Sequence, residues 1–251
     1  MLAEADTTED AALGGRLVLR QPKRGHRFGH DAILLAAAVD ARPGEIAVDL
    51  GAGVGTAGLA LAHRVPGVAV RLVEVDATLA DLARENAARN RLSDRVSVAT
   101  LDVAAERSAF ERHGMVGVDH VLMNPPFNDP ANVSPDAARR RAHVAGAGAL
   151  ATWVDCAAAL LAARGTLTLI WRATGLSDVL GALGGTFGGI AILPIHPKPS
   201  AAAIRILVRA VRGSGAPLVL LPPLMLNRAD GTPSAEAEAV LRGGVSLPMT
   251  A

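Results

Sequence analysis

Four consecutive residues near the middle of the chain, Asn124, Pro125, Pro126 and Phe127, can together hold a flat amino group. The prolines fix two φ angles and push the residue before them toward an extended conformation, so the stretch forms a stiff projection. The Asn124 side-chain oxygen and the Pro125 carbonyl can then accept both hydrogens of a planar NH₂ group, which keeps electron density on its nitrogen for attack on a methyl group. Phe127 supplies a stacking face. The alternative is a Pro-Pro turn that only closes a strand.

A glycine-rich loop lies earlier in the chain, in the stretch DLGAGVG, where Asp49, Gly51 and Gly53 alternate. Glycines let a backbone turn tightly and approach a ligand closely. A carboxylate in this loop would repel the phosphates of a dinucleotide, whereas it favours the ammonium and sulfonium charges of S-adenosylmethionine. The loop therefore indicates S-adenosylmethionine as the cofactor, and a glycine turn without a ligand is the alternative.

Two more acids follow the next two predicted strands. Glu74 ends the second strand about twenty residues after the glycine loop, where a carboxylate can accept hydrogen bonds from ribose hydroxyls. Asp102 comes just after the third strand, at a position suited to the adenine of such a cofactor. Asp102 can instead start a helix as its capping residue.

The elements that must position these residues alternate along the chain. We expect strands at 46–50, 68–75, 95–100, 119–124 and 166–171, with helices at 56–64, 77–91 and 149–163. This alternation predicts an α/β fold with a doubly wound, Rossmann-like and mostly parallel sheet, whose carboxyl edge binds ligands. Residues 189–197 and 204–211 follow each other without a helix, so we expect them to add an antiparallel pair.

Composition indicates one globular domain. The chain has 251 residues, of which 50% are hydrophobic and 20% charged, enough for a full core. We expect disorder over the acidic residues 1–14 and a single domain over 15–251 that includes a short N-terminal segment covering the cofactor. The one cysteine, Cys156, indicates neither a disulfide framework nor a cysteine metal site, and we read it as a small buried hydrophobe; no metal is expected.

The net charge of +1 conceals an uneven distribution of basic residues. Arg139, Arg140 and Arg141 are consecutive, and Arg205 and Arg209 lie on a predicted strand. Such clusters are typical of a polyanion-binding surface, although a solvated surface explains them as well. No apolar run reaches the length of a membrane helix and no leader opens the sequence, so we expect a cytoplasmic protein.

The combination of DLGAGVG, Glu74, Asp102 and NPPF resembles the class I S-adenosylmethionine-dependent methyltransferases that modify planar nitrogens in adenine, cytosine or glutamine. More narrowly, QPKRGHRFGHDAILLAAAV (21–39) resembles a segment of the bacterial tRNA1(Val) adenine N6-methyltransferase family. The resemblance covers roughly residues 15 to 245. It implies methylation of the adenine just 3′ of the anticodon, position 37 of a valine tRNA, with tRNA as the partner and S-adenosylmethionine as the cofactor.

The resemblance also assigns roles to individual residues. It implies that Asp49, Gly51 and Gly53 hold the methionine end of the cofactor, Glu74 the ribose and Asp102 the adenine, and that Asn124 to Phe127 hold the target base. Asn124 is also assigned to the cofactor site. The resemblance further implies that Phe28 and Asp31 lie over the cofactor, and Asp31 can also cap a helix beginning near Ala32. One departure is Phe127, where relatives often have tyrosine, so that a hydroxyl is lost while stacking survives.

Other functions remain open at this point. An adenine of ribosomal RNA or a glutamine of a translation release factor has the same planar nitrogen chemistry. Release-factor enzymes usually carry a separate helical N-terminal domain, for which about 45 residues before the first strand are too few. A non-catalytic cofactor- or RNA-binding module would not need two aligned amide acceptors, and a nucleotide-dependent oxidoreductase would not explain NPPF.

Overall fold

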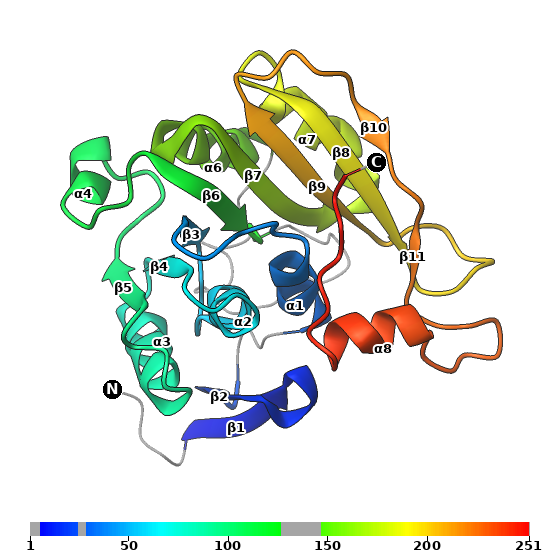
Figure 1. Ribbon diagram of the computed structural model, residues 1–251, viewed down its shortest axis with the longest axis horizontal. Helices are drawn as coiled ribbons and strands as arrows, with labels where there is room; N and C mark the ends of the chain where they lie inside the picture. The colour runs from blue at the N-terminus through cyan, green and yellow to red at the C-terminus, as the bar shows by residue number, and fades with distance from the viewer. Residues whose placement is uncertain (1–5, 25–28, 127–146, 251) are drawn as a thin grey trace.

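The computed structural model describes residues 6–24, 29–126 and 147–250, without side chains for 147–149 (Figure 1). Within these ranges the main sheet has nine strands in the order β10-β8-β9-β7-β6-β3-β4-β5, with β11 also paired to β8. One half of the sheet is parallel and consists of β3 (Ile46–Leu50), β4 (Ala69–Glu74), β5 (Val96–Thr100), β6 (Val118–Met123) and β7 (Leu161–Arg172).

The second part of the sheet contains the antiparallel strands. Strand β9 (Arg205–Arg212) pairs antiparallel with both β7 and β8 (Phe187–His196). Two short strands, β10 (Val219–Leu220) and β11 (Leu224–Met225), run parallel to β8. The predicted fold class, a mostly parallel sheet extended by an antiparallel pair, is therefore confirmed.

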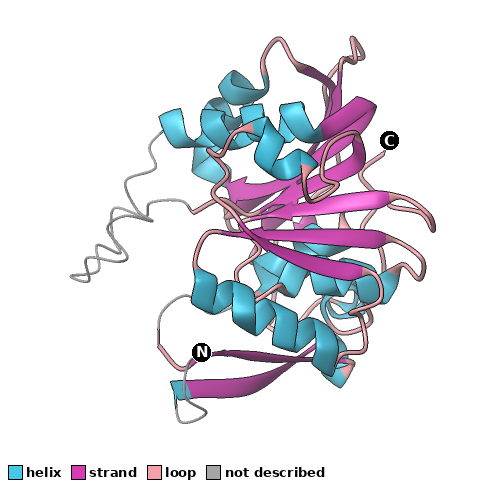
Figure 2. Cartoon of the chain, turned by 90° about the vertical axis from the view of Figure 1, so that its left-hand side faces the viewer, coloured by secondary structure: helices cyan, strands magenta, loops and turns pink. Residues whose placement is uncertain are grey.

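Helices cover both faces of the sheet (Figure 2). One buried cluster joins the sheet to α1 (His30–Ala37), α2 (Thr56–Arg64), α3 (Ala77–Arg89) and α8 (Ala235–Leu241). A second cluster joins the opposite face to α4 (Arg107–Glu111), α6 (Ala147–Leu160) and α7 (Leu176–Leu183). Strand β3 is buried on both faces, which explains its short apolar sequence. No helix among the described residues is long and apolar enough to cross a bilayer.

The boundaries of the predicted elements are mostly close to those observed. Strand β3 and helix α2 have the predicted limits, and α3 begins as predicted because Asp76 caps it by accepting from the backbone N–H of Thr78 at 2.8 Å. The helix predicted over 149–163 is α6, but it ends at Leu160 and the chain continues directly into β7. The helix considered at Asp102 does not form, since α4 begins only at Arg107.

An N-terminal hairpin corrects the expectation of disorder for residues 7–14. Strands β1 (Thr7–Ala12) and β2 (Leu17–Pro22) pair antiparallel below α3 in Figure 1 and are joined by a short 3-10 turn at Leu13–Gly15. The side-chain amide of Asn86 accepts from the backbone N–H of Arg20 at 2.7 Å and donates to the backbone carbonyl of Arg20 at 2.9 Å. It thus satisfies both backbone groups of Arg20, as a residue of a neighbouring strand would. This hairpin packs on the domain and orders residues 7–14.

Candidate active site

Two strand ends meet at the centre of the carboxyl edge of the sheet. Leu50 of β3 pairs with Met123 of β6, so Gly51 and Asn124 leave the sheet side by side. From β3 the chain goes on to β4 and β5 on one side, whereas from β6 it goes on to β7 on the other. Ligands of open α/β sheets bind at such a switch point. The glycine loop and the NPPF stretch therefore begin as neighbours in the crevice.

Asp49 is a buried carboxyl next to the glycine loop. Its side chain is 2% exposed, and its Oδ2 accepts from the backbone N–H of Gly58 in α2 at 2.8 Å. Burial raises the pKa of Asp49 to about 7, against the lowering effect of the Gly58 N–H, and the charge of Glu74 adds a smaller increase. A cationic ligand beside Asp49 would favour its ionised form.

Glu74 ties the glycine loop to the end of β4. It is buried, and its Oε2 accepts from the backbone N–H of Gly53 at 2.7 Å while Oε1 accepts from that of Asp76 at 2.9 Å. Each carboxylate oxygen keeps a further lone pair for a ligand hydroxyl. A Cβ placed on Gly53 would meet no atom within 4 Å, so the loop backbone borders open space.

Asn124 presents an unpaired polar atom. Its Oδ1 is buried and has no hydrogen-bond partner among the described residues. A buried acceptor without a donor costs free energy, which a ligand with an N–H group can recover. Pro125, which follows, is buried and Pro126 is exposed. Phe127 lies outside the described residues.

Asp102 lies in an exposed turn after β5. Its Oδ1 accepts from the backbone N–H of Ala104 at 2.8 Å, so it stabilises a turn rather than capping a helix. The next strand end is close, since the backbone N–H of Leu101 donates to the carbonyl of Glu74 at 3.1 Å. The contact of Asp102 with adenine stays a prediction.

Comparison with known proteins identifies the family. A model of the methyltransferase small domain matches residues 27–192, which include α1, the glycine loop, Glu74 and Asn124. The chain belongs to the methyltransferase small domain family. The family resemblance predicted from the sequence is confirmed, and S-adenosylmethionine is the methyl donor that the family uses.

Relatives with named activities are similar over part or most of this methyltransferase. A tRNA1(Val) (adenine(37)-N6)-methyltransferase of Porphyromonas gingivalis is 34% identical over 157 residues, which is 61% of this chain and 61% of that protein. A protein of the same name from Aeromonas hydrophila is 28% identical over 82% of this chain and 84% of its own length. A predicted O-methyltransferase from Agrobacterium tumefaciens has a crystal structure that matches with a TM-score of 0.74 and 29% identity, over 88% of this chain and 100% of that one.

The described residues of the methyltransferase fit S-adenosylmethionine. The buried carboxyls of Asp49 and Glu74 would disfavour a phosphate, but they suit a ligand that carries cations and ribose hydroxyls. The open space beside Gly53 lets such a ligand reach the loop backbone. When bound, the cofactor supplies an electrophilic methyl group on a sulfonium, and the chain supplies the contacts that hold it against the acceptor.

Asp31, predicted to lie over the cofactor or to cap a helix, has another partner in the structure. Helix α1 begins after its N-cap residue Gly29, so Asp31 lies inside the first turn and not at the cap. Asp31 Oδ2 instead accepts from Arg205 Nε at 2.8 Å, which links α1 to the start of β9. The capping alternative is therefore wrong, and the charge of Arg205 is partly neutralised. Phe28 and Arg139–Arg141 lie outside the described residues.

Two residues near the site were missed in the sequence. Gly58, in α2, provides the N–H that binds Asp49. Trp153, in α6, lies with its ring edge against Gly51. The only sequence signal for Gly58 was a fourth glycine after the loop, and for Trp153 it was the scarcity of tryptophan, of which the chain has two.

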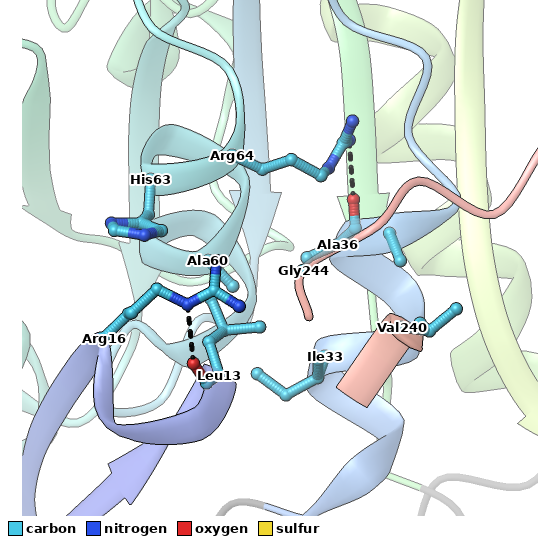
Figure 3. A pocket seen from close by; sticks show the side chains of 10 residues that line it. Leu13, Arg16, Ile33, Ala36, Ala60, His63, Arg64, Val240 and Gly244 are labelled. Carbon is cyan, nitrogen blue, oxygen red and sulfur yellow. Dashed lines mark hydrogen bonds between the residues drawn. The ribbon is translucent and has the colours of Figure 1, made fainter. Parts of the chain in front are cut away.

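A cavity of about 170 Å³ lies elsewhere in the fold, between the N-terminal hairpin, α1, α2 and α8 (Figure 3). Arg16, His63 and Arg64 contribute its basic lining, and burial together with the charges of Arg16 and Arg95 lowers the pKa of His63. His63 and Arg64 are in the last turn of α2, whereas the glycine loop precedes its first turn. The cavity is therefore separate from the crevice.

Asp49 should make the stability of the ligand-free methyltransferase depend on pH. The folded protein holds the Asp49 proton up to about pH 7, but the unfolded chain releases it near the ordinary pKa of 3.8. Because the folded state binds more protons in this window, the free energy of unfolding should fall by roughly 3 kcal/mol between about pH 5 and about pH 8. Urea unfolding measured across this pH range should show that the free energy of unfolding falls less with pH in Asp49→Asn than in the wild type. Identical declines would contradict the raised pKa.

Gly58→Ala should destabilise the fold, because α2 lies very close to the sheet there. A Cβ on Gly58 would lie 2.3 Å from Leu72 Cδ2 and 3.1 Å from Asp49 Oδ2. We expect a loss of about 1 to 3 kcal/mol in urea unfolding. The matched control is Gly181→Ala in α7, where a Cβ meets no atom within 4 Å and alanine should stabilise the helix by about 0.5 to 1 kcal/mol. Equal effects of the two substitutions would exclude the close approach.

Proposed function

We propose that this methyltransferase transfers a methyl group to the exocyclic N6 amino group of an adenine in tRNA. The proposed target is the adenine at position 37 of a valine tRNA. The observation that carries the proposal is the buried Oδ1 of Asn124, which has no hydrogen-bond partner within the described part of the chain and lies about one strand spacing from the glycine loop. An exocyclic NH₂ is the kind of donor that this oxygen lacks.

The proposed role of Asn124 is to orient the acceptor nitrogen. Its Oδ1 and the carbonyl oxygen of Pro125 accept one hydrogen each from the NH₂ group, so that the nitrogen lone pair stays available and points toward the methyl carbon. The new N–C bond forms as the S–C bond breaks, and the extra proton then leaves the nitrogen for water. No general base is needed before the transfer, and positioning provides most of the rate enhancement.

The names of the relatives support adenine in tRNA as the acceptor. The similar proteins of Porphyromonas gingivalis and Aeromonas hydrophila are both named for adenine 37 of tRNA1(Val). A glutamine amide also offers a planar NH₂ group and is the second candidate for the same oxygen. An O-methyl acceptor fits less well, because a hydroxyl has a single hydrogen for two acceptors.

The test is transfer of a labelled methyl group from S-adenosylmethionine to unmodified tRNA, ribosomal RNA and release factor in parallel. Nucleoside and amino-acid mass analysis identifies each labelled product. The proposal predicts N6-methyladenosine in the tRNA pool. Label confined to ribosomal RNA or to a release-factor glutamine would show that tRNA is not the substrate. An O-methylated product would overturn the role given to Asn124.

A further inference from the structure

Trp153 lies directly against the glycine loop. It belongs to α6, which covers the face of the sheet opposite α2. A Cβ on Gly51 would lie 2.3 Å from the Cη2 atom of Trp153 and 2.9 Å from Cζ3, so the outer edge of the indole touches the Gly51 backbone. Gly51 also has a φ of 67°, which other residues rarely adopt. The position therefore needs glycine both for its conformation and for the tryptophan.

Asn124 leaves the sheet beside the glycine loop that the indole contacts. Gly51 and Asn124 follow the paired residues Leu50 and Met123, and neighbouring strands are about 4.8 Å apart. A ring in contact with Gly51 is consequently within one side chain's reach of Asn124. Trp153 is only partly buried, so part of its surface remains available to a ligand.

Cys156 lies one helical turn after Trp153 in α6 and belongs to the buried cluster on the same side of the sheet. Residues three apart share a helix face, which places Cys156 beside Trp153. Burial raises the pKa of the Cys156 thiol to about 12, and the charge of Asp102 contributes to this increase. The α6 contact at Gly51 therefore belongs to the loop predicted to hold the methionine end of the cofactor.

We propose that the Trp153 indole is a wall of the methyl-transfer site and contacts the methionine end of the bound cofactor. The proposal rests on the cofactor position argued above, but not on the identity of the acceptor. A large aromatic surface would exclude water from the transfer site, and a sulfonium bound over the ring face rather than at its edge would be favoured over the neutral thioether of S-adenosylhomocysteine. Trp153 would therefore help to bind the substrate form of the cofactor and to release the product form.

Fluorescence tests this contact, because the chain has two tryptophans. In Trp171→Phe, Trp153 is the sole tryptophan, and its emission should change on titration with S-adenosylhomocysteine, with the same dissociation constant that calorimetry gives. In the matched control, Trp153→Phe, the emission comes from Trp171 of β7, which is 4% exposed. This emission should change little on titration with S-adenosylhomocysteine. Calorimetric binding without a change in Trp153 emission would overturn the proposal. Absence of binding would overturn the cofactor site itself and the proposal with it.

Affinity provides a second readout. Trp153→Leu should raise the dissociation constant of S-adenosylmethionine about 3-fold to 30-fold, and that of S-adenosylhomocysteine distinctly less. Trp153→Phe should retain most of the preference for S-adenosylmethionine over S-adenosylhomocysteine, because the phenyl ring is smaller than the indole but still aromatic. Urea unfolding identifies any general loss of stability. A stability loss with an unchanged ratio of the two dissociation constants would reduce Trp153 to a packing residue.

Discussion

Asn124→Ala is expected to lower the rate of methyl transfer by about 100-fold to 1,000-fold, which is the usual effect of removing one aligned hydrogen-bond group from a transfer site. The dissociation constant of S-adenosylmethionine should stay within about threefold, because we propose that Oδ1 binds the acceptor nitrogen and not the cofactor. Stability should not fall through loss of this acceptor, since Oδ1 has no partner within the described ranges. Single-turnover rates and calorimetry measure the two effects separately.

Asn90→Ala is a matched control for this substitution. The Asn90 side chain accepts from the backbone N–H of Val18 at 2.9 Å and donates to its carbonyl at 2.8 Å, so it supports the N-terminal hairpin away from the crevice. Its removal should lower stability and leave the transfer rate of the folded protein unchanged. A large loss of cofactor affinity in folded Asn124→Ala, with normal transfer at saturation, would contradict the role proposed for Asn124.

Glu74→Ala should produce the opposite pattern and weaken cofactor binding first. The variant loses the carboxylate that accepts from the backbone N–H of Gly53 at 2.7 Å. We propose that the same carboxylate also accepts hydrogen bonds from the ribose hydroxyls of the cofactor. Hydrogen bonds to a charged group contribute about 1.5 to 3 kcal/mol each, so we expect the dissociation constant to rise roughly 10-fold to 100-fold. Transfer at saturating cofactor should be reduced far less than in Asn124→Ala.

Two further variants separate the ribose contact from the support of the loop. Glu74→Gln keeps one acceptor oxygen, so a Gly53 bond can survive while the charge is lost, and its affinity should lie between those of wild type and Glu74→Ala. Glu85→Ala removes an acid of α3 that pairs with Arg20 at 3.2 Å, and it should leave the affinity unchanged. Wild-type affinity in Glu74→Ala would exclude Glu74 from the site.

The central sheet and the glycine loop could be predicted because their signals are local. Each strand from β3 to β6 is a short, largely apolar run with an acid or an amide within two residues of its carboxyl end. Because parallel strands place these ends on one edge, the sequence order alone implied that Asp49, Glu74 and Asn124 face one crevice. The adjacency of Gly51 and Asn124 follows from the pairing of β3 with β6, which the sequence does not state.

The N-terminal hairpin could not be predicted because its partners are distant in sequence. Asn86 and Asn90 lie 66 and 72 residues from the backbone groups that they bind in β2. Seen locally, the first dozen residues are small and acidic, and this composition favours disorder. In the structure, Glu9 Oε1 of β1 lies 2.7 Å from Nη1 of Arg89. One of the acidic residues at the N-terminus is therefore part of an ion pair with α3.

The surroundings of the site were hidden for the same reason. Asp31 was a reasonable helix cap by its position, but its charge is used by Arg205, 174 residues away. Trp153 stands in an alanine-rich helix without a motif around it, and only the approach of α6 to Gly51 gives it a place beside the glycine loop. Contacts between separate elements, rather than the motifs themselves, were the missing information.

The most direct test uses two transcripts of valine tRNA that differ only at position 37, one with adenine and one with guanine. Each is incubated with the protein and labelled S-adenosylmethionine, and the nucleosides are then analysed by mass. The account predicts N6-methyladenosine from the adenine transcript and no label above background from the guanine transcript. Equal labelling of both transcripts, or no labelling of either by a protein that binds the cofactor, would contradict the proposed acceptor.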